Sequence, residues 1–278
     1  MGKILAICSD SKKTGKSVIT YMLANQITKS RKIKVLVCCL NLKYSSLYYL
    51  FKVEPFETGI EDLINYGIYE SLEENILMSL IPRCGDIYFL GSYKSTNSYI
   101  IRNQEKYSGL LDTLKKNFDL VIVDTVSAKE NTLTKLVLQK ADLAVKLYCQ
   151  DIENIREQSA NEVSLNGDSV NNLKKTIRLI AKYRDIYPHE ADFKKSLNDK
   201  NIFVHEYCET LQEMKNRDRL HLYLQRDSAA NRSVKKLSEY VLQLLEIQRE
   251  KTEENTHQVF SFWSLERFFR RVGIESNK

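Results

Sequence analysis

The chain has 278 residues, of which 43% are hydrophobic and 28% are charged, and its formal net charge is +6. This composition is ordinary for a globular protein and excludes a largely disordered or collagen-like chain. The basic excess is too small to require a nucleic-acid partner, although basic residues around 29–34 and 174–178 could contact phosphates or anionic lipid. No run of about 18 apolar residues occurs, so the sequence predicts no membrane-spanning helix.

Six cysteines occur, at positions 8, 38, 39, 84, 149 and 208. There is no CxxC pair, and the four histidines are not grouped with cysteines, so neither a zinc site nor a disulfide framework is expected. The apolar run at the N-terminus is too short for a signal peptide. Several of the cysteines fall in predicted buried strands, and reduced buried thiols are typical of a cytoplasmic protein.

Short apolar runs alternate with longer amphipathic segments. Continuous apolar strands separated by helices predict an α/β fold, with a mostly parallel sheet covered by helices on both faces. In chain order we expect strand Lys3–Cys8, helix Ser17–Ser30, strand Ile33–Cys39, helices Ile60–Tyr66 and Leu72–Leu80, strand Ile87–Leu90, helix Tyr107–Asn117, strand Leu120–Val123, helix Asn131–Gln139, strand Leu143–Tyr148, helix Asp151–Asn161, strand Thr176–Ala181 and helix Arg232–Arg249.

The composition changes near the C-terminus. Residues Glu250–Gln258 are almost entirely polar, and a strongly aromatic segment follows them. We therefore expect one α/β domain over residues 1–249, a polar tether over 250–258 and an amphipathic helix over 259–278.

The loop Ser9–Ser17, between the first strand and the first helix, resembles the phosphate-binding pattern G-x-x-x-x-G-K-[ST]. Asp10 occupies the first glycine position, and aspartate tolerates the left-handed backbone that such a turn needs. Backbone N–H groups at a helix N-terminus bind phosphate, and a Gly-Lys-Ser tripeptide met by chance in a surface loop is the alternative. The residues expected to bind nucleotide are Ser11, Lys13, Thr14, Gly15, Lys16, Ser17 and Val18.

A second pattern lies at Phe118–Asp124, where a buried strand ends in an aspartate. In P-loop proteins such an aspartate holds Mg²⁺ opposite the hydroxyl of the phosphate loop. We therefore expect Ser17 and Asp124 to form the metal side of the site. Taken alone, Asp124 could equally be a turn residue at the end of a strand.

Together these elements resemble the MinD/ParA family of deviant Walker ATPases over roughly residues 1–248, including a switch-like segment at Val35–Leu42 and an Ala-Asp-Leu strand start at Lys140–Val145. The resemblance implies a P-loop fold, ATP and Mg²⁺ as ligands, and a homodimer that encloses the nucleotide. Among the branches of the family, the chain is most similar to the TadZ/CpaE proteins, which place pilus-assembly machinery.

The chain departs from the family at functional positions. The signature lysine of the loop, which acts across the dimer, falls at Ser11, and Lys12 beside it is the candidate substitute. The aspartate that orients the attacking water falls at Asn41, and an amide cannot accept a proton as a carboxylate does. A second family aspartate falls at Cys39, and the asparagine that reads adenine falls near Ala181. The resemblance therefore implies nucleotide binding with weak or absent hydrolysis, whereas a plain turn residue is the alternative for Asn41.

On a helix, residues 262, 265, 268, 269 and 272 of the tail form an apolar stripe opposite arginines. Such a helix can lie in the headgroup region of an anionic membrane, and the resemblance implies a C-terminal helix of this kind. Docking in a partner groove and docking on the domain itself are the alternatives, and the polar tether argues against the latter. The expected membrane contacts are Phe262, Trp263, Leu265, Phe268, Phe269, Arg270 and Arg271.

Three functions fit these features. The first is an ATP-binding dimer on the inner face of the bacterial membrane that positions a pilus or secretion apparatus. The second is a ParA-like partition ATPase that binds DNA, for which an aromatic tail is not required. The third is a capsule-type tyrosine autokinase, which would end in a tyrosine cluster, whereas Tyr240 is the last of the 16 tyrosines here.

Overall fold

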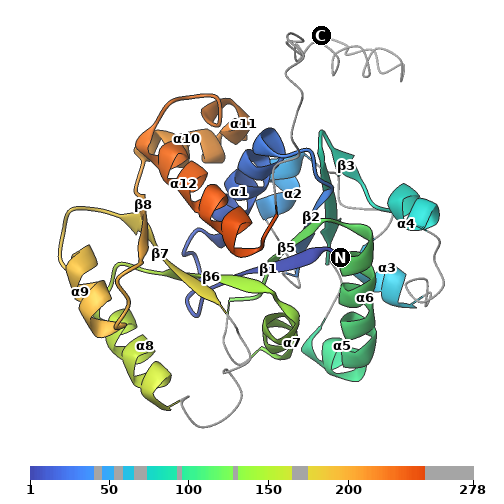
Figure 1. The fold of residues 1–278 in the computed structure, drawn as a ribbon, viewed down its shortest axis with the longest axis horizontal. Helices are drawn as coiled ribbons and strands as arrows, with labels where there is room; N and C mark the ends of the chain where they lie inside the picture. Colours follow the sequence, from blue (N-terminus) through green and yellow to red (C-terminus); the bar gives the residue numbers. More distant parts are fainter. Residues whose placement is uncertain are drawn as a thin grey trace. The chain divides into compact units, whose positions relative to one another are not determined.

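In a computed structural model of the chain, the residues described are 1–40, 46–52, 59–65, 74–92, 96–127, 131–164 and 175–247 (Figure 1). Asn41, the polar segment 250–258 and the aromatic tail lie outside the described residues, so their predicted roles stay predictions. The described part of Met1–Gln248 is built on one sheet with strand order β3-β4-β2-β5-β1-β6-β7-β8.

The sheet is parallel throughout except at one edge, where β3 pairs antiparallel with β4. Its central strands are mostly apolar, and all of their residues except Lys3 are buried, as expected for strands covered on both faces. The strands are β1 Lys3–Cys8, β2 Val35–Cys39, β3 Arg83–Cys84, β4 Ile87–Gly91, β5 Leu120–Asp124, β6 Leu143–Tyr148, β7 Thr176–Tyr183 and β8 Phe203–Glu206.

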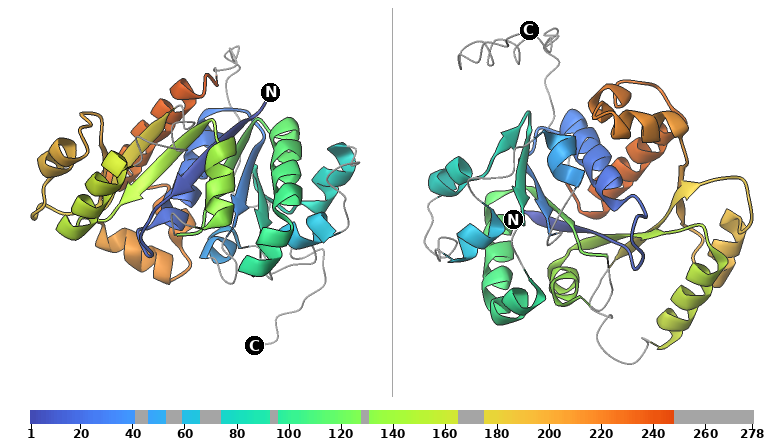
Figure 2. Two further views of the ribbon diagram at one scale, coloured as in Figure 1. Left: turned by 90° about the horizontal axis from the view of Figure 1, so that it is seen from below. Right: turned by 180° about the vertical axis from the view of Figure 1, so that it is seen from behind.

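Helices cover both faces of the sheet (Figures 1 and 2). On one face α1 packs against α2 and α12, and α10 and α11 lie beside them; on the other face α6 packs against α3 and α7. The helices are α1 Lys16–Ser30, α2 Ser46–Phe51, α3 Ile60–Asn65, α4 Glu74–Leu80, α5 Asn97–Arg102, α6 Gln104–Asn117, α7 Thr132–Lys140, α8 Ile152–Ser164, α9 Glu190–Ser196, α10 Glu209–Asn216, α11 Leu220–Tyr223 and α12 Ala229–Leu244.

The alternation of side chains along each strand divides the core into two layers. In β1, Leu5 and Ile7 join the cluster beneath α1 and α12, whereas Ile4 and Ala6 join the cluster beneath α6 and α7. A third, smaller cluster around Tyr148 joins β6 and β7 to α8 and α9. The predicted α/β class with a mostly parallel sheet is therefore confirmed.

Several elements were missed by the sequence analysis: α2, α5, α9, α10, α11, β3 and β8. All of them are short, and β8 combines half-buried residues with a buried histidine and an exposed glutamate, so it lacks the continuous apolar run of the central strands. Predicted boundaries shifted by a few residues elsewhere; for example, α12 ends at Leu244 rather than continuing to Arg249.

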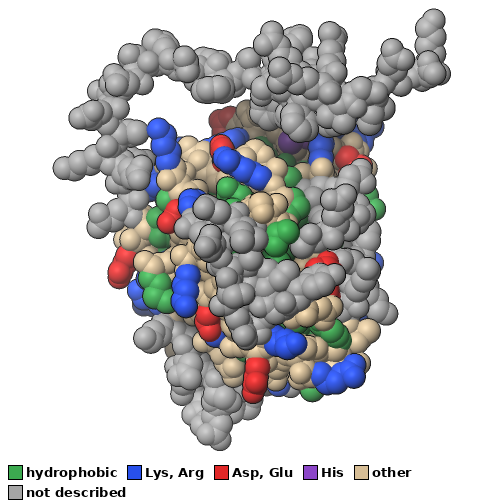
Figure 3. Space-filling model, turned by 90° about the vertical axis from the view of Figure 1, so that its right-hand side faces the viewer, with side chains coloured by type: hydrophobic (Ala, Val, Ile, Leu, Met, Phe, Trp, Pro, Cys, Tyr) green, Lys and Arg blue, Asp and Glu red, His purple; other side chains and the backbone are tan. Residues whose placement is uncertain are grey.

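The charge distribution on the surface and the character of the helices are relevant to the predicted DNA and membrane partners. On the described part of the face in Figure 3, basic and acidic side chains are interspersed. Among the residues that the structure describes, no helix has both the length and the apolar character that crossing a bilayer requires.

The order of the central strands determines where the functional residues meet. β1 lies between β5 and β6, and in the β1–β5 pairing Ile7 is opposite Asp124. The loop that leaves β1 therefore starts beside the aspartate at the end of β5. In open parallel sheets, ligands bind at this carboxyl edge of the strands.

Candidate functional site

The N-terminus of α1 is open to a ligand. Gly15 is its N-cap residue, at a φ of 100°, and no side chain caps the helix. The first amides of a helix have no partner within it, so the N–H groups at the start of α1 can donate to an anion. A side chain at residue 15 would be strained at this φ, which explains the glycine.

The first half of the loop is held by side chains. Lys146 of β6 forms an ion pair with Asp10 at 3.0 Å, and Asn154 of α8 donates to the hydroxyl of Ser11 at 3.1 Å. The left-handed non-glycine residue of the loop is Lys13, at a φ of 60°. Asp10, at the first glycine position of the pattern, is not left-handed, and its carboxylate pairs with Lys146.

Three predicted residues converge beneath the loop. The hydroxyl of Ser17 donates to Oδ2 of Asp124 at 2.8 Å, and the buried ammonium of Lys16 donates to the hydroxyl of Ser127. The other oxygen of Asp124, Oδ1, is buried and has no hydrogen-bond partner among the described residues. A buried carboxylate oxygen left in this way is a ready ligand for a cation or a water bound to one.

The carboxyl group of Asp124 is fully buried at the end of β5. Burial raises the pKa of Asp124 from 3.8 to about 6, whereas the charge of Lys16 and the hydrogen bond from Ser17 lower it. Without a bound cation, the charged form is therefore costly, and a divalent ion would stabilise it.

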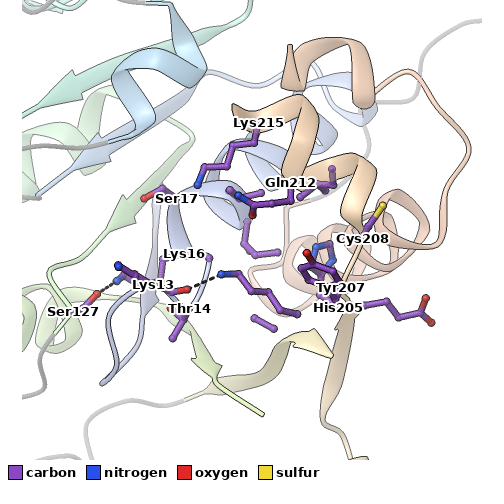
Figure 4. Close-up of a pocket in the computed structure, with 17 residues that line it drawn as sticks. Lys13, Thr14, Lys16, Ser17, Ser127, His205, Tyr207, Cys208, Gln212 and Lys215 are labelled. Carbon is purple, nitrogen blue, oxygen red and sulfur yellow. Dashed lines mark hydrogen bonds between the residues drawn. The ribbon is translucent and has the colours of Figure 1, made fainter. Parts of the chain in front are cut away.

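A cavity of about 430 Å³ opens above α1 (Figure 4). This volume is within the range typical of small-molecule sites. Its floor is residues 13–19, and the opposite wall comes from β7, β8 and α10. Among the described residues that line it, Lys13, Lys16, Lys182 and Lys215 are basic and Glu206 is acidic, so the cavity favours an anion.

A nucleoside triphosphate with Mg²⁺ fits this donor set. The open amides and the lysines suit phosphate, and Ser17 and Asp124 are the oxygen ligands that Mg²⁺ prefers.

Most of the predicted site residues meet in this cavity. Lys13, Thr14, Gly15, Lys16, Ser17 and Val18 all line it, whereas Ser11 and the exposed Lys12 do not. Asn41 is outside the described residues, but Leu40 before it donates its backbone N–H to the carbonyl of Asp124 at 3.0 Å. Asn41 therefore follows, in the sequence, a residue whose backbone is hydrogen-bonded to Asp124.

Other lining residues were missed. Ser127, three positions after Asp124, could have been suspected from that spacing. Gln212 and Lys215 lie on α10, which the sequence analysis missed, and Lys182 lies one residue beyond the predicted strand Thr176–Ala181. His205 was assigned no role at the site from the sequence. It is buried in β8, its Nδ1 lies 2.9 Å from the hydroxyl of Ser233, and it lines the cavity. Burial lowers the pKa of His205 to about 4, which keeps the ring neutral at physiological pH.

Comparison of the sequence with known proteins gives one relative. No family model matches the chain. The septum site-determining protein MinD of Helicobacter pylori (strain ATCC 700392 / 26695) is 25% identical over 161 residues, which are 56% of this chain and 56% of that protein. The chain therefore aligns with only about half the length of this curated relative.

Solved structures share the fold over nearly the whole domain. A ParA family ATPase from Chlorobium tepidum TLS superposes with a TM-score of 0.73 and 14% identity, covering 86% of this chain and 98% of that one. MinD from Pyrococcus horikoshii OT3, complexed with Mg-ADP, gives a TM-score of 0.72 and 17% identity, covering 91% and 100%. Identities this low show a common fold and, by themselves, nothing of its ligands.

Replacing the buried carboxylate should change how stability depends on pH. Because the pKa of Asp124 is raised in the folded state, the folded protein binds this proton more tightly than the unfolded chain does. The resulting stabilisation is complete below the unfolded pKa and is lost as the pH rises through about 6. In magnesium-free buffer, Asp124→Asn should therefore be more stable than the native chain near neutral pH, by up to about 3 kcal/mol.

Thermal unfolding of both proteins across the acidic to neutral range measures this difference. The advantage of Asp124→Asn should shrink as the pH falls from about 6 toward the unfolded pKa of 3.8. Magnesium with ATP should reverse the order near neutral pH. Parallel pH profiles for the two proteins would contradict a buried, ionised Asp124.

Proposed function

Because the chain belongs to the MinD/ParA family of P-loop proteins, we propose that it binds ATP and Mg²⁺ in the cavity above α1. The observation that carries this proposal is the meeting of the uncapped N-terminus of α1 with the buried carboxylate of Asp124. One group binds phosphate and the other serves a cation. The two groups are far apart in the sequence, and the pairing of β1 with β5 brings them together in the fold.

Each residue has a defined task in this proposal. The ammonium of Lys16 leaves the hydroxyl of Ser127 for the β and γ phosphates, and the amides of residues 15–18 wrap the same groups. The hydroxyl of Ser17 and the carboxylate of Asp124, which lie 2.8 Å apart, would hold the cation. Bound Mg²⁺ would neutralise charge on the phosphate oxygens. Two relatives support these ligands: the P. horikoshii MinD structure contains Mg-ADP, and a Borrelia burgdorferi plasmid partition protein is bound to AMPPNP.

Removing the ammonium of the loop tests nucleotide binding. Lys16→Ala should weaken ATP binding roughly 100-fold, because charge-assisted hydrogen bonds to phosphate are lost in a buried site. Isothermal titration calorimetry with Mg²⁺, and again with a chelator, measures the change. Lys29→Ala is the matched control, since Lys29 is an exposed lysine in the last turn of the same helix. A native chain that binds no adenine nucleotide would overturn the proposal.

We further propose that hydrolysis is slow. In the pairing of β2 with β5, Cys39 lies opposite Asp124, and Asn41 follows two residues later in the sequence. An asparagine at this position cannot accept a proton from the attacking water. Lys12 is exposed in the loop between β1 and α1 and remains the candidate for a contact with the second copy in a dimer.

Restoring the carboxylate tests the catalytic part. Asn41→Asp should raise the steady-state rate of phosphate release roughly 100-fold or more, the usual scale of a positioned general base. Asn41→Ala should leave the slow rate unchanged. Rapid turnover by the native chain would show that hydrolysis does not depend on a carboxylate at this position.

The remaining part of the proposal concerns location. In the cytoplasm, the ATP-bound chain would form a homodimer, attach to the inner face of the bacterial membrane through residues 259–278 and mark a place for a pilus or secretion apparatus. A chain of a MinC:MinD cell division protein complex from Aquifex aeolicus has the same fold, with a TM-score of 0.70 and 13% identity over 92% of this chain and 100% of that one, and this likeness supports assembly with a partner protein.

The tail offers a direct membrane assay, because Trp263 is the only tryptophan of the chain. With anionic vesicles, its fluorescence should shift to shorter wavelength and the full chain should sediment, whereas a chain ending at Gln248 should stay in solution. Neutral vesicles, and the variant Arg270→Glu with Arg271→Glu, should reduce both effects. An unshifted Trp263 spectrum would favour a partner groove, and salt-sensitive retention of DNA would favour the partition ATPase.

A further inference from the structure

A lysine far from the phosphate loop in sequence lies directly on it. The ammonium of Lys182, in β7, donates to the backbone carbonyl of Lys13 at 2.8 Å. Its Cε would be 3.6 Å from a Cβ added to Gly15, the N-cap of α1. The positive charge is therefore held at the open end of the helix, and Figure 4 marks the bond to Lys13 with a dashed line.

The backbone of β7 is distorted in a way that places this side chain. Lys182 has a φ of 57°, and the pairing of β7 with β8 shifts register between Ala181 and Tyr183. Neighbouring residues of a regular strand point to opposite faces, yet Ala181 and Lys182 both line the cavity. A bulge re-aims side chains in this manner, and a left-handed lysine is unfavourable unless the surrounding structure requires it.

A second lysine faces the same space from α10. Lys215 is half-buried and lines the cavity, and its pKa is lowered by burial and by the charge of Lys182. Among the described residues, neither Lys182 nor Lys215 forms an ion pair. Two like charges gathered in one cavity repel each other, and an anion between them removes that cost.

We propose that Lys182 is a phosphate-binding residue of this chain, with Lys215 beside it, and that it takes the ligand's phosphate groups from the wall opposite the loop. This inference rests on the proposed nucleotide site. On binding, the ammonium of Lys182 exchanges the carbonyl of Lys13 for a phosphate oxygen while it stays above Gly15. Lys182 of β7 would thereby supply a positively charged group to the phosphates. In the family that the chain resembles, the loop position occupied here by Ser11 carries a lysine.

Calorimetry with ATP, ADP, AMP and adenosine, each with Mg²⁺, tests the assignment on the full chain. Lys182→Met should weaken ATP binding roughly tenfold, the effect of one charge-assisted hydrogen bond, and adenosine binding by less than about twofold. Lys182→Arg should restore most of the ATP affinity. Lys182→Asn, which tolerates the left-handed backbone, should behave like Lys182→Met and excludes an effect of strain.

Lys175→Met is the matched control, because Lys175 is an exposed lysine just before β7 that does not line the cavity. It should leave all four affinities unchanged. Equal losses for ATP and adenosine would mean that Lys182 only shapes the loop, and no loss would mean that it does not contact the ligand; either result overturns the inference. If the native chain binds ATP and Lys182→Met binds it equally well, this inference is wrong and the proposed function stands. If the native chain binds no nucleotide, the proposed function is wrong as well.

Discussion

The arrangement of the site depends on one buried charge, the carboxylate of Asp124 at the end of the central strand β5. Burial in the core disfavours the charged form of this carboxyl group and raises the pKa of Asp124. The partners that offset it, Ser17 and Lys16, belong to the first turn of α1. The pairing of β1 with β5 brings this turn over the aspartate, so sheet order and site chemistry cannot be separated.

The cavity above this charge has two walls of different character. The wall formed by the loop and α1 follows the general design of a phosphate site, with open amides and a glycine at its N-cap. The wall formed by β7, β8 and α10 contributes Lys182, Lys215 and the neutral ring of His205. Ligand preference can therefore be set by the second wall without changing the first.

The parts of the fold that the sequence predicted are those whose signal is local and repeated. β1 and β5 are apolar except for one charged residue at an end, β6 is apolar except for Lys146, and Gly15, Lys16 and Ser17 follow β1 at the spacing that a phosphate loop requires. In the structure the hydroxyl of Ser17 lies 2.8 Å from Oδ2 of Asp124, and the role of the two residues toward a metal stays a proposal.

What could not be predicted depends on contacts between distant segments. The left-handed residue of the loop is Lys13 and not Asp10, and Lys146, from a strand far along the chain, pairs with the Asp10 carboxylate. Lys182 reaches the loop through a bulge that arises only when β7 pairs with β8. Asn154 and Ser11 likewise meet across more than a hundred residues. No local pattern encodes such pairs.

The lengths of the two outermost strands have a consequence for assembly. β3 has two residues and β8 has four, so each border of the sheet presents few unpaired backbone groups. Short borders resist the lateral addition of strands from another molecule. A sheet bordered in this way is a poor template for a continuous hydrogen-bonded ladder shared between two molecules.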